Sequence, residues 1–217
     1  MKKMMFHLAK AKDDAYSNRV VPWKLRQRSL PGLAHMPTFT PAAMRILEAL
    51  GIPVAMVLAR NLVEFVEATS LEVAETGQEG RKHMLAPAAA KAWQRLKDAA
   101  SRDGVELNII SAFRSVQRQV EIIERKISKG LSIDQILEFS APPFFSEHHT
   151  GCAIDVGTPG SKDLEREFEE TEAFVWLSQH ASDYGFEMSF PLNNTSGYAY
   201  EPWHWRYTDT LAPSLTG

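Results

Sequence analysis

Two stretches of the chain contain residue types that can bind a metal ion and catalyse hydrolysis. The first, SEHHTGCAID (residues 146–155), contains His148 and Asp155; in the second, His204 follows Glu201 by three residues. Two histidines and one aspartate can hold Zn²⁺ and leave one coordination position open for water. A carboxylate beside that water, such as Glu201, can act as a general base. The combination predicts a hydrolytic zinc site.

The first stretch leaves the identity of its histidine ligand open, because His148 and His149 are adjacent. Neighbouring residues of an extended chain point in opposite directions. We therefore expect one histidine to face the metal and the other to lie at the surface or behind a ligand. The spacing of His148, Gly151 and Asp155 suits a loop that leads into a strand. Taken alone, the pair also fits an exposed histidine and an aspartate at the end of a turn.

The second stretch contains Pro202, which is incompatible with a regular central strand. The chain must turn there, and a turn can direct Glu201 and His204 toward one site. Trp203 and Trp205 flank the histidine and are expected in the apolar core. Two simpler interpretations remain open: Glu201 as a solvated loop carboxylate, and His204 as a hydrogen-bonded histidine beside the tryptophans.

A third stretch, SAFRSVQRQ (residues 111–119), places Arg114 where a predicted strand meets a predicted helix. A guanidinium there can hold a carboxylate through two hydrogen bonds or polarise a carbonyl oxygen. Gln119 could add a hydrogen bond. In isolation Arg114 would be interpreted as a surface residue. Cys152 is expected to be a small buried residue rather than a ligand or nucleophile, because it lies on the opposite strand face from Asp155.

The elements that must position these residues follow from apolar periodicity and from Pro and Gly positions. An irregular arm is expected over residues 1–40 and a loop over residues 70–85. Extended chain is expected over residues 141–145. Helices are predicted over residues 41–50, 53–69, 87–102, 116–128, 132–139 and 164–184. Strands are predicted over residues 105–110, 152–156, 186–190 and 203–208. Helices segregated from non-adjacent strands predict an α+β fold with a mainly antiparallel sheet.

The composition of the 217 residues is ordinary for a globular protein, with 44% hydrophobic and 24% charged residues. The formal net charge of −3 and the lack of a basic block argue against a nucleic-acid partner. Cys152 is the one cysteine, so no internal disulfide can form. The most apolar window, residues 46–65, contains charges and is interrupted by Gly51 and Pro53. We expect neither a transmembrane segment nor an export signal at the start of this sequence.

Four stretches together resemble the zinc D-alanyl-D-alanine carboxypeptidase family of the VanY type. They are SAFRS with Gln119, the pattern S-x-H-x-x-G-x-A-x-D at 146–155, Trp-Leu…Tyr-Gly-Phe…Phe-Pro within 176–191, and GYAYEPWHWRY at 197–207. The resemblance covers roughly residues 85–208. It implies an α+β fold, a mainly antiparallel sheet flanked by helices, shared with D,D-dipeptidases and the Hedgehog signalling domain. A catalytic domain over residues 81–217 would follow an arm and helical extension over residues 1–80.

The resemblance also implies the role of each residue in the site. Zinc would be bound by His148, Asp155 and His204. Glu201 would be the general base toward a zinc-bound water, and Arg114 would stabilise the developing oxyanion or grip the substrate. The implied reaction is hydrolysis of the terminal D-Ala-D-Ala bond of peptidoglycan stem peptides or muropeptides.

Ser111, Arg114 and Gln119 would hold the peptide, with Ser111 and Gln119 near its terminal carboxylate. Phe113 departs from the tyrosine that is common in the family. Alternatives are an L,D-carboxypeptidase, a D,D-dipeptidase, a cell-wall endopeptidase, or a catalytically silent zinc-containing binding module. The resemblance suggests the cell envelope, but the missing export signal leaves the compartment open, and the sequence does not give the oligomeric state.

Overall fold

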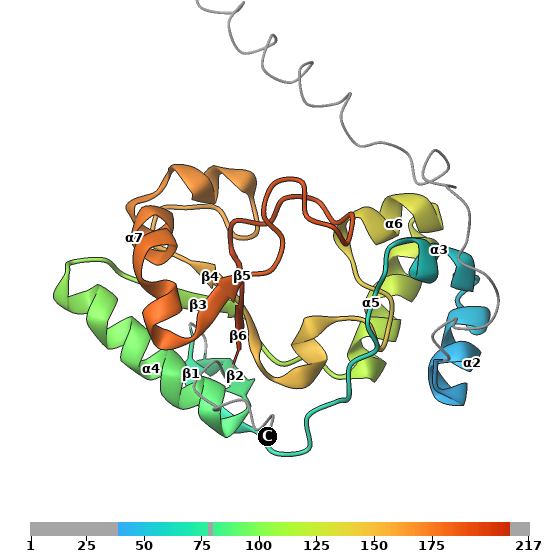
Figure 1. Cartoon of the computed structure of the whole chain (residues 1–217), viewed down its shortest axis with the longest axis horizontal. Helices are drawn as coiled ribbons and strands as arrows, with labels where there is room; N and C mark the ends of the chain where they lie inside the picture. Colours follow the sequence, from blue (N-terminus) through green and yellow to red (C-terminus); the bar gives the residue numbers. More distant parts are fainter. Residues whose placement is uncertain (1–38, 78–79, 209–217) are drawn as a thin grey trace, which may run out of the picture. The chain divides into compact units, whose positions relative to one another are not determined.

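The computed structural model of the chain describes residues 39–77 and 80–208 (Figure 1). The described residues belong to one compact unit. The arm expected at residues 1–40 lies almost wholly outside the described residues, and the domain boundary expected after residue 80 stays a prediction. In the part of the chain that is described, no helix is long and apolar enough to cross a membrane.

A four-stranded antiparallel sheet forms the centre of this unit, in the order β3–β4–β6–β5. The strands are β3 (Asn108–Ser111), β4 (Ala153–Gly157), β5 (Phe186–Met188) and β6 (His204–Tyr207). All three pairings are antiparallel, which confirms the expected sheet. On the central strand β4, Asp155 lies opposite Ser111 of β3 and opposite His204 of β6. The pairing register alone therefore brings two candidate ligands side by side.

Helices precede and connect the strands of the sheet. They are α2 (Pro41–Ala49), α3 (Val54–Ala59), α4 (Pro87–Arg102), α5 (Val116–Ser128), α6 (Ile133–Phe139) and α7 (Glu172–His180). Single 3₁₀ turns are η4 (Glu147–Thr150), η5 (Arg166–Glu170) and η6 (Ala181–Tyr184). The main apolar core joins α4 and α7 to the sheet, and Trp93 and Leu96 of α4 are fully buried in it. Figure 1 shows α5 and α6 apart from α4, α7 and the sheet.

Local signals explain where several helices begin. Ser115 caps α5, because its side chain accepts a hydrogen bond from the Arg118 amide. Ser132 and Gln135 form a capping box at α6. Thr40 caps α2, as its side chain accepts from the amide of the third following residue. The predicted starts of these helices are confirmed.

The helix predicted over residues 53–69 is wrong beyond Ala59, where α3 ends. Residues 60–71, here called the strap, turn at Arg60 and Asn61 and continue without helix or strand. The strap makes its hydrogen bonds with distant segments, for example from the Ala68 amide to the His149 carbonyl at 2.8 Å. The apolar spacing that suggested a helix is therefore satisfied by packing against the body, where tertiary contacts override local propensity.

The loop predicted over residues 70–85 is wrong, because these residues contain the antiparallel hairpin of β1 (Glu72–Thr76) and β2 (Lys82–Leu85). Glu75 ties the hairpin to the core: its carboxylate accepts from the Trp93 indole at 3.1 Å and from the Ile109 amide at 3.0 Å. Such distant partners explain why local sequence did not reveal the strands.

Two further predictions need correction. The helix predicted over residues 164–184 is broken into η5, α7 and η6, because Thr171 is extended and caps α7 with its own side chain. The segment 141–145 is not extended throughout, since Phe144 turns the chain with a φ of 73°. The four predicted strands exist, with ends shifted by up to three residues.

Candidate metal centre

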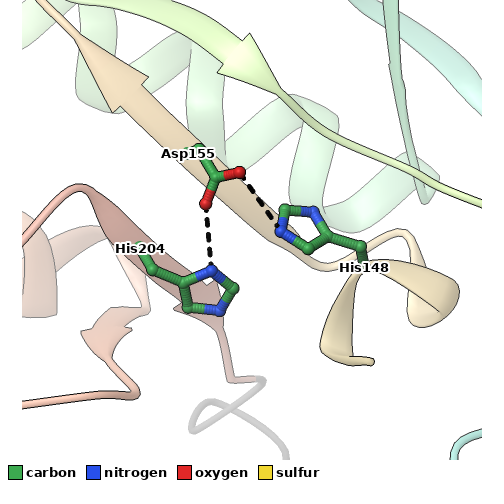
Figure 2. Close-up of side chains that lie close together, drawn as sticks. All are labelled: His148, Asp155 and His204. Atoms are coloured by element: carbon green, nitrogen blue, oxygen red, sulfur yellow. Dashed lines mark hydrogen bonds and ion pairs between the residues drawn. The ribbon is translucent and has the colours of Figure 1, made fainter. Parts of the chain in front are cut away.

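Three elements bring the predicted ligands together: η4 contributes His148, β4 contributes Asp155 and β6 contributes His204. One ligand atom of each lies within 4.8 Å of the other two. Both histidines point toward the aspartate (Figure 2), with His148 Nε2 3.3 Å from Oδ2 and His204 Nδ1 3.0 Å from Oδ1. All three residues are buried. The structure thus groups the three residues that the sequence predicted as ligands.

The turn between His148 and Asp155 depends on Gly151. This residue ends η4 with a φ of 68°, a left-handed conformation that favours glycine. A Cβ atom there would lie 2.9 Å from the Ala86 amide nitrogen and 2.9 Å from the Leu71 side chain. The close packing of the strap and of the segment before α4 therefore requires glycine at this turn.

Hydrogen bonds on the far side of each imidazole fix which nitrogen faces the aspartate. His148 Nδ1 lies 2.7 Å from the Ala112 carbonyl oxygen, to which it donates. His204 Nε2 lies 2.9 Å from Glu147 Oε2. Metal-binding histidines usually donate their second ring nitrogen in this way, which fixes the tautomer and ring orientation. The donor atoms that remain, His148 Nε2, His204 Nδ1 and the Asp155 carboxylate, fit Zn²⁺ in type and grouping.

The charges at the centre are strongly coupled. Burial lowers the pKa of His204, but hydrogen bonds with Asp155 and Glu147 outweigh burial and raise the pKa to about 10. Burial raises the pKa of Glu147, but hydrogen bonds with His204 and Ser189 outweigh it and lower the pKa to about 2. The pKa of Asp155 is likewise lowered, since both histidines offset its burial. Without metal, an imidazolium therefore lies between two carboxylates.

Glu147 is a site residue that sequence reasoning missed. Its carboxylate also accepts from Ser189 Oγ at 2.6 Å and from Arg206 Nη1 at 3.3 Å. The available signal was the alternation of β6, which puts His204 and Arg206 on one face. That alternation indicates two cationic side chains on one strand face, but it does not indicate which carboxylate contacts them.

His149 has a supporting position. It is fully buried; its Nδ1 lies 2.6 Å from the Arg114 carbonyl oxygen, and its Nε2 accepts from the Phe144 amide at 3.2 Å. Of the two possibilities left open for it, the surface position is excluded. Cys152 is half-buried against the apolar core, as expected for a small packed residue.

Glu201 and Arg114 lie beside the three ligands. Glu201 Oε2 is 3.9 Å from His204 Nδ1. Burial raises the pKa of Glu201 to about 7, with the charges of Asp155 and Glu147 adding to the rise and those of His204 and Arg114 opposing it. Arg114 Nη1 donates to Gln119 Oε1 at 2.9 Å. Glu201 is thus a carboxyl group whose proton affinity suits exchange near neutral pH.

A cavity of about 590 Å³ opens onto the centre, and Arg114, Glu201 and the three ligands line it. Among the described residues, Ser111 and Gln119 are not part of its lining. Gln119 is buried, and its amide also donates to the Ala141 carbonyl at 2.6 Å. The structure therefore gathers five of the seven predicted site residues around one space and places Gln119 behind Arg114.

A His–Asp–His donor set on the wall of a cavity, with a further carboxyl group close by, is the arrangement of a zinc hydrolase. Residues 82–210 match the VanY family, described as D-alanyl-D-alanine carboxypeptidase. The chain belongs to this family. The expected family and α+β D,D-peptidase fold are confirmed.

Known relatives agree with this assignment. The chain is 36% identical over 139 residues to YodJ of Bacillus subtilis, which is provisionally named a carboxypeptidase; the match spans 62% of this chain and 50% of YodJ. It is 32% identical over 124 residues to a D-alanyl-D-alanine carboxypeptidase of Enterococcus faecalis, across 52% of this chain and 44% of that protein. The chain thus spans about half the length of these curated relatives.

Two solved structures share the fold. The LD-carboxypeptidase LdcB aligns with a TM-score of 0.59 at 31% identity, over 65% of this chain and 69% of LdcB. A glutamate-to-alanine mutant of the vancomycin-resistance D,D-pentapeptidase VanY, in complex with Zn(II), aligns with a TM-score of 0.52 at 28% identity, over 67% of this chain and 85% of that chain.

Proposed function

We propose that this chain is a zinc-dependent D,D-carboxypeptidase that removes the terminal D-alanine from peptidoglycan stem peptides ending in D-Ala-D-Ala. The observation that carries the proposal is the buried His148–Asp155–His204 cluster, with Glu201 beside it on the cavity wall. Membership of the VanY family and the likeness to a zinc-bound D,D-pentapeptidase support it.

His148, Asp155 and His204 would hold the zinc ion, which when bound lowers the pKa of a water molecule and polarises the scissile carbonyl. Glu201 takes the proton of the attacking water, and its pKa of about 7 suits that task. Arg114 faces the same cavity and donates to the oxygen on which negative charge develops. Glu201 then returns its proton to the leaving amine, which frees D-alanine.

Gln119 serves this mechanism from behind the cavity. It accepts from Arg114 Nη1 and donates to the Ala141 carbonyl, so it fixes the direction of the guanidinium. The proposed contact of Ser111 and Gln119 with the terminal carboxylate of the peptide stays a prediction. Ser111 lies in β3 opposite Asp155, and Gln119 has both ends of its amide occupied.

An L,D-carboxypeptidase is the second candidate, because LdcB is similar in structure at 31% identity. The two activities would use the same catalytic groups and differ in the peptide that fits the cavity. A silent binding module is less well supported. The described residues offer three metal ligands rather than a closed set of four, and Glu201 lines the cavity beside them.

The test is mass spectrometry of the zinc-loaded protein with stem peptides, with Glu201→Gln as the matched control. We expect one D-alanine to be released from the pentapeptide, no change in the tetrapeptide and no product from the control. Cleavage of the tetrapeptide alone would establish L,D-carboxypeptidase activity. Cleavage of neither peptide would refute the proposal and favour a binding module.

A further inference from the structure

One wall of the cavity contains a lysine that the proposed chemistry does not use. Lys126 lies in the last turns of α5 and lines the cavity together with Ser140, which follows α6. The Lys126 ammonium donates one hydrogen bond, to Ser140 Oγ at 2.6 Å. A lysine ammonium carries three N–H donors and no acceptor. Two donors therefore remain for groups that enter the cavity.

Within residues 39–77 and 80–208, this ammonium has no counter-charge in contact. No carboxylate of the described residues lies within 4.0 Å of it. Burial lowers the pKa of Lys126, and the charge of Arg114 lowers it further, while Glu201 opposes both. A half-buried cation that lacks a carboxylate partner loses hydration that an anionic ligand could replace. Lys126, Arg114 and Glu201 all line the same cavity.

A structural role alone explains the position of Lys126 less well. A cation in the last turn of a helix interacts favourably with the helix dipole, but this interaction does not require the cation to line a cavity. Lys129, three residues further along the chain, is exposed in this way. Phe139 and Leu164 add exposed apolar surface to the same cavity, with exposed fractions of 58% and 44%. A cation beside exposed apolar surface fits a ligand with an aliphatic part and an acidic group.

We propose that Lys126 and Ser140 form a subsite that binds a carboxylate of the peptide substrate. The inference rests on the proposed function, because the subsite belongs to the same cavity. Two carboxylates of a stem peptide share this chemistry. One is the C-terminal carboxylate of the residue to be released, and the other is the side-chain carboxylate of a diaminopimelate residue before the D-Ala-D-Ala pair. Lys126 would thereby select the substrate without taking part in bond cleavage.

The test compares KM and kcat of the zinc-loaded full chain and its variants on two peptides. The first, diacetyl-L-lysyl-D-Ala-D-Ala, has only its terminal carboxylate; the second has meso-diaminopimelate in place of lysine. We expect Lys126→Met to raise KM roughly tenfold or more with little change in kcat, as for loss of a charge-assisted hydrogen bond. Lys126→Arg should restore most of the affinity. Lys129→Met has the same change in net charge and should match the wild type.

The peptide that responds identifies the carboxylate. A rise in KM for both peptides indicates the terminal carboxylate, and a rise for the diaminopimelate peptide alone indicates the side chain. Ser140→Ala provides a second variant should Lys126→Met not fold, with an expected rise in KM of about threefold. Unchanged KM values in the folded variants, in an active enzyme, would overturn the subsite and leave the proposed function standing. A wild-type protein that neither cleaves these peptides nor binds them by calorimetry would overturn both.

Discussion

Arg60 connects the strap to the part of the chain that contains Glu201, and its replacement should destabilise the whole unit. Its guanidinium donates to the Ser196 carbonyl at 2.8 Å and to the Leu137 carbonyl at 2.6 Å. It also lies over the Tyr198 ring, 4.1 Å from the ring centre. Arg60 therefore holds the loop between β5 and β6 against the end of α6. Yet it lies outside the region that matches the VanY family.

The size of the effect follows from these contacts. A hydrogen bond from a charged donor contributes ~1.5–3 kcal/mol, and a desolvated cation–π contact about 2 kcal/mol. Against these gains, burial lowers the pKa of Arg60, and its second terminal nitrogen is buried without a partner. We therefore expect Arg60→Ala to lower the free energy of unfolding by roughly 2–4 kcal/mol.

Urea denaturation of the metal-free protein measures this difference. Arg45→Ala removes an exposed arginine of α2 and is the matched control, with an expected change below about 0.5 kcal/mol. Arg60→Lys should be intermediate, because an ammonium cannot reach two carbonyls and stack on the ring in the same way. Unfolding of Arg60→Ala at the same urea concentration as the control would show that Arg60 does not hold the loop between β5 and β6 in place.

Three further predictions concern the metal centre. Glu147→Gln should weaken zinc affinity about 10–100-fold, because it removes the charge that His204 Nε2 faces. Competition with a chelator measures the affinity. Glu121→Gln, on the exposed face of α5, is the control. Glu201→Gln should abolish hydrolysis while zinc content stays at one ion per chain. Because the folded pKa of Glu201 is raised to about 7 from 4.5, its ionisation costs the metal-free protein stability as pH rises from 4.5 through 7, by at most about 3 kcal/mol. Glu201→Gln should remove that loss of stability. Urea denaturation in EDTA should therefore show the variant to be more stable than the wild type at pH 8 and as stable as the wild type at pH 4.5. Gly151→Ala should lower the free energy of unfolding by more than about 2 kcal/mol, since the left-handed φ and the 2.9 Å contacts of the added Cβ act together. Thermal unfolding measures the loss. Comparison with Gly130→Ala, which has a left-handed φ but whose Cβ meets open space, isolates the contribution of the contacts.

The features that sequence predicted well are those with local causes. Ser115 caps α5 through an amide three residues away, so the helix start could be read from the chain itself. Likewise, Asp155 and His204 are opposite each other because two short strands pair in register, and the residue types suggested that they belong together. The resemblance already selected His148 rather than His149 as the ligand. The structure agrees, since His148 Nε2 lies 3.3 Å from Asp155 Oδ2, whereas both ring nitrogens of His149 face the backbone of Phe144 and Arg114.

The features that sequence missed have distant causes. Glu147 meets Ser189 and His204, which are 42 and 57 residues away along the chain. Leu62 of the strap is buried although the strap is not helical, so tertiary packing satisfies part of the apolar spacing that suggested a helix. Arg60 was not predicted as important for the same reason: its partners belong to α6 and to the loop before Glu201, and no local pattern connects them.

The charges around His204 indicate how this proposed ligand is oriented. Asp155 contacts both histidines, and the His204 imidazolium lies between Asp155 and Glu147, so a proton on His204 occupies the position of the metal charge. Zinc bound at Nδ1 would displace that proton, so we expect the metal affinity to rise with pH below the raised pKa of His204. Glu147 remains on the other nitrogen in both states. The same hydrogen bond therefore stabilises the imidazolium in the metal-free protein and orients the imidazole as a ligand when zinc is bound.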